Sequence, residues 1–185
     1  MKVLVACEFS GIVRDAFLEK GHEAVSCDIL PTEKPGSHYL GYVQDILYTQ
    51  HWDLMIAHPP CTYLASSGAR WWNSRRKEQE EALEFINVLL YAPIEKIALE
   101  NPVGAISSHI RKPDQIIQPW MFGHGETKAT CLWLKNLPLL IPTNIVEGRE
   151  TIVHNSPDSK DRWKKRSRTL TGIAAAMADQ WGQVK

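Results

Sequence analysis

The sequence lacks an excess of charge of either sign, since its 185 residues include 21 lysines and arginines and 21 aspartates and glutamates. Proteins that coat or package nucleic acid are usually basic overall, so contact with nucleic acid would have to come from a local basic patch. Hydrophobic residues make up 44% and charged residues 23% of the chain. These values are close to those of ordinary globular proteins and disfavour a disordered or fibrous chain.

Cysteine is scarce, with four in the chain and no C-x-x-C pair. A chain of this length does not need disulfides to fold, so the cysteines favour a reducing cytoplasm. The seven histidines are scattered without ligand spacing, and we therefore expect no metal site. The apolar run before Glu8 is too short for a signal peptide or a membrane span, and we expect no membrane association.

Apolar runs alternate with segments of helical periodicity. We expect strands at 3–7, 23–27, 53–57, 96–99 and 130–134, a further strand beginning at 139–141, helices near 12–20, 75–91 and 172–181, and loops at 30–42 and 147–168. This alternation predicts an α/β fold of Rossmann-like type, with a mostly parallel sheet flanked by helices. The length predicts that 1–185 form one domain.

Polar clusters follow four of the expected strands: Glu8–Gly11, Asp28, His58–Thr62 and Glu100–Pro102. In parallel α/β sheets, ligands bind beyond the carboxyl ends of the strands. The four clusters therefore predict a site at that edge of the sheet.

Two prolines stiffen the turn that precedes Cys61. A nucleophilic thiol has to be held on a rigid, accessible turn, and Pro59-Pro60-Cys61 has that form. A small cysteine packed in a loop is an equally good interpretation of the tripeptide alone.

Glu100 ends an apolar strand, so its carboxyl group is expected to be desolvated. Desolvation raises the pKa of a carboxyl group, and a protonated Glu100 would donate a hydrogen bond to a ring nitrogen. A turn formed by Glu100 and Asn101 is the alternative.

Phe9-Ser10-Gly11 follows the first strand and indicates either close approach of the backbone to a ligand or tight packing. Asp28 ends the second strand, where an acid binds the ribose of a nucleoside cofactor. An ordinary turn aspartate is the alternative, but the spacing from Gly11 favours the ribose.

Taken in order, these motifs resemble those of the cytosine-5 methyltransferases. The matching segments are Phe9–Gly11, Asp28, Asp53–Cys61, Ala98–Pro102 and Gly172–Ala178. The resemblance is to a small, phage-like form of the family. It spans nearly the whole chain as spaced motifs, and implies the fold of an S-adenosylmethionine-dependent methyltransferase.

The resemblance implies that S-adenosylmethionine binds beside the first two strands, with Phe9 against its adenine and Asp28 at its ribose. The other residues implied at the cofactor are Ser10, Gly11, Ile29, Asp45 and Pro59.

The resemblance also implies that Cys61 attacks carbon 6 of cytosine and that Glu100 contacts the ring nitrogen and the exocyclic amine. Carbon 5 then becomes nucleophilic enough to take a methyl group. Lys128 stands for the first arginine of the family's Gln-x-Arg-x-Arg motif. The residues implied to contact the substrate are Pro60, Asn101, Arg166 and Arg168.

The sequence departs from the family pattern at Thr62, where glutamine is usual, at Tyr42, which replaces an acid, and at Thr130, which replaces the second arginine. The chain between Trp133 and Gly172 has no room for a separate target-recognition region. Its absence predicts little sequence preference.

Two segments combine cations with tryptophan. The segment Lys160–Arg168 contains Trp163 and suits phosphate contact and base stacking, or a solvated loop. The pair Trp71-Trp72, beside Arg70 and Arg75-Arg76, would either stack on a substrate base or fill the core beneath a lid.

Three hypotheses remain open at this point: methylation of cytosine in DNA, the same chemistry on RNA or a free nucleotide, and a non-catalytic binding module. Cys61 together with Glu100 favours an enzyme. The basic segment Lys160–Arg168 favours a nucleic-acid polymer, with DNA as the expected partner.

Overall fold

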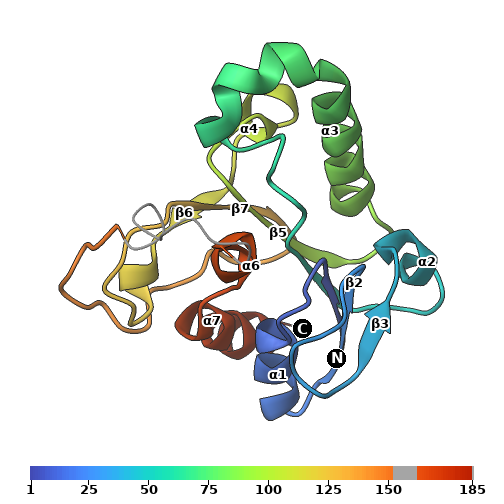
Figure 1. Ribbon diagram of the computed structural model, residues 1–185. Coiled ribbons are helices and arrows are strands. Elements are labelled where there is room, and N and C mark those ends of the chain that lie inside the picture. Colours follow the sequence, from blue (N-terminus) through green and yellow to red (C-terminus); the bar gives the residue numbers. More distant parts are fainter. Residues whose placement is uncertain (152–161, 185) are drawn as a thin grey trace.

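The computed structural model describes residues 1–151 and 162–184. Seven strands form one sheet in the order β3-β2-β1-β4-β5-β7-β6 (Figure 1). The strands are β1 (Lys2–Ala6), β2 (Glu23–Asp28), β3 (His38–Leu40), β4 (Leu54–Ala57), β5 (Lys96–Pro102), β6 (Gln115–Ile117) and β7 (Thr130–Lys135). The helices are α1 (Ile12–Glu19), α2 (Val43–Leu47), η1 (Ser66–Arg75), α3 (Arg76–Leu90), α4 (Ile106–His109), η2 (Pro119–Met121), α6 (Arg162–Ser167) and α7 (Thr171–Trp181).

The first five strands pair in parallel, whereas β7 runs antiparallel to both β5 and β6. The chain winds outward from β1 to β3 and then returns to place β4 on the other side of β1. That reversal opens a crevice at the carboxyl ends of β1 and β4, which is where open α/β sheets bind ligands. The expected Rossmann-like α/β fold with a mostly parallel sheet is confirmed.

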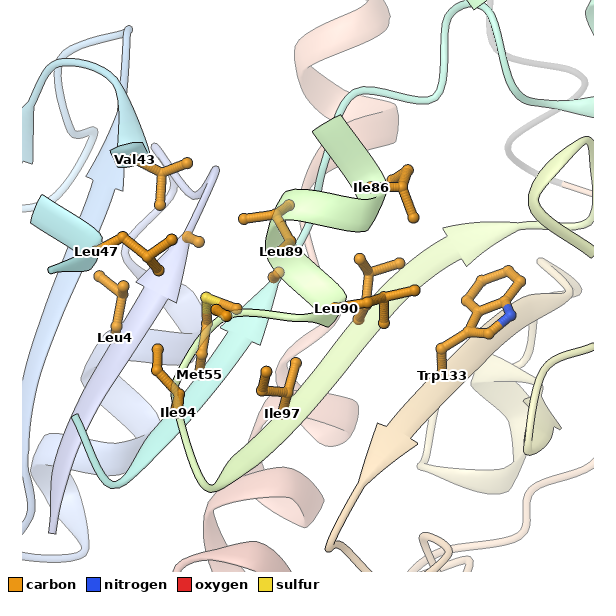
Figure 2. Close-up of a cluster of buried hydrophobic side chains, with 14 of the residues drawn as sticks. Leu4, Val43, Leu47, Met55, Ile86, Leu89, Leu90, Ile94, Ile97 and Trp133 are labelled. Carbon is orange, nitrogen blue, oxygen red and sulfur yellow. The ribbon is translucent and has the colours of Figure 1, made fainter. Parts of the chain in front are cut away.

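Helices α2, α3 and α4 cover one face of the sheet. Apolar side chains of β1, β4, β5 and β7 pack there against α2 and α3, and none of the core residues labelled in Figure 2 is more than 9% exposed. These are Leu4, Val43, Leu47, Met55, Ile86, Leu89, Leu90, Ile94, Ile97 and Trp133. The continuous apolar runs of the central strands follow from burial on both faces.

Helices α1 and α7 cover the opposite face (Figure 1). Trp181 is fully buried there, and its indole N–H donates to the carbonyl of Pro138 at 2.9 Å. The first turn of α7 lies so close to the carbonyl of Phe122 that a Cβ on Gly172 would come within 1.9 Å of that oxygen. Glycine is therefore required where α7 begins.

The central strands and helices α1, α3 and α7 match the sequence predictions, whereas η1, which has ten residues, and most of the short elements were not predicted. Strand β3 lies within 30–42, which was expected to be a loop, and the described end of 147–168 contains α6. No strand forms at 139–141, and β7 pairs instead with β5 and the unpredicted β6. Strands β3 and β6 have three residues each, so their tertiary pairing outweighs a weak local signal. No helix in the described part of the chain is long and apolar enough to cross a membrane.

Candidate active site

The carboxyl ends of four parallel strands meet at one edge of the sheet. Ala6 of β1 lies opposite Cys27 of β2 and opposite Ala57 of β4, and Ala57 lies opposite Leu99 of β5. The residues that follow these positions therefore lie side by side, although β5 continues beyond its expected end at residue 99, through Glu100 and Asn101 to Pro102, and pairs there with β7. The predicted convergence of the four polar clusters at this edge is confirmed.

Glu8 occupies the N-terminus of α1. Its carboxylate accepts hydrogen bonds from the backbone N–H groups of Val13 at 2.7 Å and Arg14 at 3.2 Å, and from the hydroxyl of Ser10 at 3.0 Å. Glu8 is 4% exposed. A helix N-terminus attracts an anion, and here the protein supplies that anion itself. Sequence analysis gave Glu8 no role.

The turn that carries Glu8 has an unusual backbone. Cys7 has a φ of 59° and Gly11 a φ of 72°, so a non-glycine residue in the left-handed region follows β1 directly. Such residues are uncommon and tend to occur at functional sites.

Asp28 and Ile29 leave β2 at the same edge. The carboxylate of Asp28 accepts a hydrogen bond from the N–H of Leu30 at 2.9 Å, but burial outweighs this bond and raises the pKa of Asp28. Ile29 is 65% exposed. A carboxylate next to an exposed apolar side chain can hold a ribose and cover an attached base.

Arg14 shapes the loop that follows Asp28. Its guanidinium is fully buried, and it donates to Ser26, Thr32 and the carbonyls of Lys34 and Pro35. Sequence analysis missed Arg14, because a cation on the first helix gives no sign of its burial.

Asp45 is exposed in the first turn of α2. Burial, followed by the charges of Asp28 and Asp45, raises the pKa of Cys27 to about 12. Both carboxylates therefore lie within electrostatic reach of Cys27, which places Asp45 on the Asp28 side of the site.

Phe9 is covered, contrary to the open adenine-binding surface that the resemblance implied. It is 6% exposed, and its ring centre lies 6.2 Å from that of Trp163 on α6. The hydroxyl of Ser10 is engaged by Glu8. In this conformation, a cofactor ring that used Phe9 would have to displace Trp163.

Arg168 is paired with an acid, although its side chain is 37% exposed. Its guanidinium binds both carboxylate oxygens of Glu33, at 2.8 and 2.6 Å, and lowers the pKa of Glu33. The N–H of Glu33 in turn donates to the carbonyl of Phe9 at 2.8 Å. Arg168 thus links the segment after α6 to the loop after β2, and its expected contact with the substrate stays a prediction. Lys160 and Asp161 lie outside the described residues.

The turn that carries Cys61 is fixed from β5. The amide of Asn101, which is 2% exposed, donates to the carbonyl of Pro59 at 2.9 Å. A Cβ on Gly104 would come within 1.9 Å of the carbonyl of Leu64, so glycine is needed for the two segments to approach. Pro60 and Cys61 themselves are exposed. The thiol is therefore accessible on a turn that the next strand holds in place, as a nucleophile requires.

His58 pairs with Glu100 across the ends of β4 and β5. The Nδ1 of His58 lies 2.8 Å from a carboxylate oxygen of Glu100. Burial alone would raise the pKa of Glu100, but the hydrogen bond from His58 and the charges of Lys128 and His58 lower it to about 2. The expected protonated Glu100 is therefore wrong, and Glu100 is a carboxylate at neutral pH.

Lys128 lies within electrostatic reach of both Glu100 and Cys61. Its ammonium donates to the carbonyl of Arg166 at 3.0 Å. Desolvation by the surrounding protein atoms raises the pKa of Cys61, and so does the negative charge of Glu100. The positive charges of Lys128 and Arg166 lower this pKa, but the net shift is upward. The structure therefore brings Cys61, Glu100, Lys128 and Arg166 together, although they come from four separate segments.

His58 is the residue of this site whose role the sequence did not indicate. Its Nε2 is buried and has no hydrogen-bond partner among the described residues. His58 lines a cleft whose other walls are Cys7, Glu8, Phe9, Ser10, Ser167 and Thr169. It thus separates Glu100 from the cleft beside α1. The feature of the sequence that could have identified His58 is its position between an apolar strand and two prolines.

Within the described residues, no cluster of three or more histidine, cysteine, aspartate or glutamate side chains could hold a metal ion. The chain matches no protein-family model and no curated protein sequence.

We predict that Lys128 and Glu100 move the reactivity of Cys61 in opposite directions. Lys128→Gln removes a cation and should raise the pKa of the thiol, whereas Glu100→Gln removes an anion and should lower it. The rate of alkylation by iodoacetamide as a function of pH, with the modified site located by mass spectrometry, measures both shifts. Lys2→Gln, at the opposite edge of the sheet, is the control. Equal profiles for all proteins would show that these charges do not reach the sulfur.

Proposed function

We propose that the protein transfers a methyl group from S-adenosylmethionine to carbon 5 of cytosine in DNA, with little sequence preference, through a covalent bond between Cys61 and the base. The observation that carries this proposal is the gathering of an accessible thiol, the His58–Glu100 pair and Lys128 at one sheet edge. The site combines a nucleophile with charged groups able to bind a polar ring.

The N-terminus of α1 supports this cofactor rather than a dinucleotide. Dinucleotides place a pyrophosphate at that position of a Rossmann-like fold, and the carboxylate of Glu8 would repel it. S-adenosylmethionine has no phosphate, so it is compatible with Glu8. Asp28 would accept hydrogen bonds from its ribose, and Ile29 would cover its adenine. When bound, the cofactor supplies an activated methyl group.

The low pKa of Glu100 gives it a specific task. As a carboxylate, it accepts a hydrogen bond from the exocyclic amine of cytosine. Attack of Cys61 breaks its S–H bond, forms the sulfur–carbon 6 bond and pushes electrons onto the ring nitrogen, so the sulfur gives up one proton and the ring nitrogen takes one up. Glu100, which shares a hydrogen bond with His58 at 2.8 Å, delivers the proton to the nitrogen, and the proton released by the sulfur restores the one that the His58–Glu100 pair has given up. Loss of the proton on carbon 5 later releases Cys61.

Asn101 acts on the reaction through Cys61. Its hydrogen bond to the carbonyl of Pro59 fixes the turn, and misplacement of a nucleophile by about 1 Å costs roughly 10²-fold in rate. Asn101 is therefore a positioning residue. Its Oδ1 is buried and has no partner among the described residues, and the substrate contact that the resemblance implied for Asn101 stays a prediction.

The proposal predicts which variants lose methyl transfer. Cys61→Ser should show no detectable transfer, and Glu100→Gln should be slower by about 10²–10⁴-fold. His58→Asn keeps a donor toward Glu100 but cannot supply a proton, so it should also be slow while it binds cofactor normally. Transfer of labelled methyl groups to DNA, RNA and dCMP in parallel measures these rates. Full activity of Cys61→Ser would refute the covalent mechanism, and activity on RNA or dCMP alone would reassign the substrate.

Cofactor binding should depend on Asp28. Asp28→Ala removes the acceptor for the ribose, and the loss of a hydrogen bond to a charged group costs about 1.5–3 kcal/mol. Titration calorimetry with S-adenosylmethionine should therefore show affinity lowered about tenfold or more. Asp179→Ala, whose carboxylate pairs with Lys20 on the surface, should bind like the wild type. Unchanged binding by Asp28→Ala would place the cofactor elsewhere.

A further inference from the structure

The segment after Cys61 forms a pocket of its own. Helix η1 begins five positions after the thiol and leads directly into α3 (Figure 1). The pocket is lined by Thr62, Tyr63, Gly68, Trp71, Trp72 and Arg75. It lies outside the cleft that Glu8 and His58 line, and the methyl-transfer proposal gives it no task.

Cations and aromatic rings alternate around this pocket. The guanidinium of Arg75 lies 5.9 Å from the ring centre of Tyr63, and that of Arg70 lies 5.2 Å from the ring centre of Trp71. Trp71 is 53% exposed. Rings held by cations in this way provide flat surfaces on which a nucleobase can stack, while the cations are free to approach its phosphates.

Trp72 lines the pocket and carries a hydrogen-bond donor that nothing in the described structure accepts. Its indole Nε1 is buried without a partner. A buried unpaired donor is unfavourable, so a ligand that brings an acceptor gains by filling the pocket. The carbonyl oxygens and ring nitrogens of nucleobases are such acceptors.

Helix η1, which supplies most of the pocket's lining, carries charge of one sign, and the acids of α3 begin at Glu78. The residues from 66 to 77 include four cations and no acid. No ion pair within the described residues involves Arg70, Arg75 or Arg76, whose side chains are exposed, and Lys77 contacts Glu81 at 3.9 Å. Because the whole chain has no net charge, this local excess points to a polyanionic ligand.

We propose that the η1 pocket binds an unstacked base of single-stranded nucleic acid, one that neighbours the base presented to Cys61. A duplex keeps the faces of its bases stacked on each other, so rings at a protein surface can stack only on bases of a single strand or on flipped bases. The substrate is therefore either a single strand or a duplex in which the target base pair has been opened. The placement beside the target base rests on the proposed function, whereas the pocket itself does not.

Fluorescence anisotropy with labelled oligonucleotides of about 12 nucleotides tests this pocket. The wild type should bind single-stranded DNA more tightly than the matching duplex, without any cofactor. Trp71→Ala should weaken single-strand binding about tenfold or more. Trp72→Phe keeps the ring and removes the donor, so a smaller loss is expected. Arg75→Gln with Arg76→Gln should lower the salt dependence of log K by about 1.4. A single-stranded RNA of the same sequence distinguishes the two nucleic acids.

Matched variants make the result decisive. Tyr91→Ala removes an exposed ring at the other end of α3, and Lys2→Gln removes a distant cation; both should bind like the wild type. Circular dichroism shows whether each variant is folded. A folded Trp71→Ala protein with unchanged affinity, or equal binding of duplex and single strand, would overturn the proposal. Cys61→Ser should bind single strands normally, so loss of catalysis with intact binding separates this pocket from the methyl-transfer proposal.

Discussion

The parallel pairing of β4 with β5 is the constraint on which the site depends. Because Ala57 lies opposite Leu99, the next residues, His58 just after β4 and Glu100 within β5, lie side by side and pair at 2.8 Å. One position further on, the amide of Asn101 reaches the carbonyl of Pro59 and holds the turn that carries Cys61. A shift of register by one residue would separate all of these contacts at once. The nucleophile is thus positioned by the sheet, although it lies on a turn.

The first strand contributes a different constraint, which concerns the kind of cofactor. By binding the N–H groups at the start of α1, Glu8 fills the place where a phosphate would otherwise be bound. The cleft beside it is bounded by His58 on one side and, on the other, by Ser167 at the end of α6 and by Thr169. The contacts of Trp163 with Phe9 and of Arg168 with Glu33 bring this last segment across the cleft. The proposed cofactor and substrate sites thus share a boundary that includes His58.

Local sequence patterns were sufficient for the central strands, for α1, α3 and α7, and for the meeting of the four polar clusters. They failed where a residue's behaviour depends on a distant partner. The pKa of Glu100 is set by His58, 42 positions away, and Arg168 is engaged by Glu33, 135 positions away. Lys128 was placed near Cys61 only through the family resemblance, because no local pattern connects a loop before β7 to a turn after β4.

The central claim is that Cys61 forms a covalent bond with carbon 6 of cytosine during methyl transfer. A fluorine on carbon 5 cannot leave as a proton does, so an oligonucleotide with 5-fluorocytosine should trap the bond after the methyl group has been transferred. Intact-mass spectrometry of the protein after incubation with this oligonucleotide and S-adenosylmethionine measures the adduct directly, and peptide mapping locates it. The account predicts a cofactor-dependent adduct at Cys61 in the wild type and none in Cys61→Ser. Methyl transfer to ordinary cytosine with no trapped species, or an adduct at another residue, would contradict it.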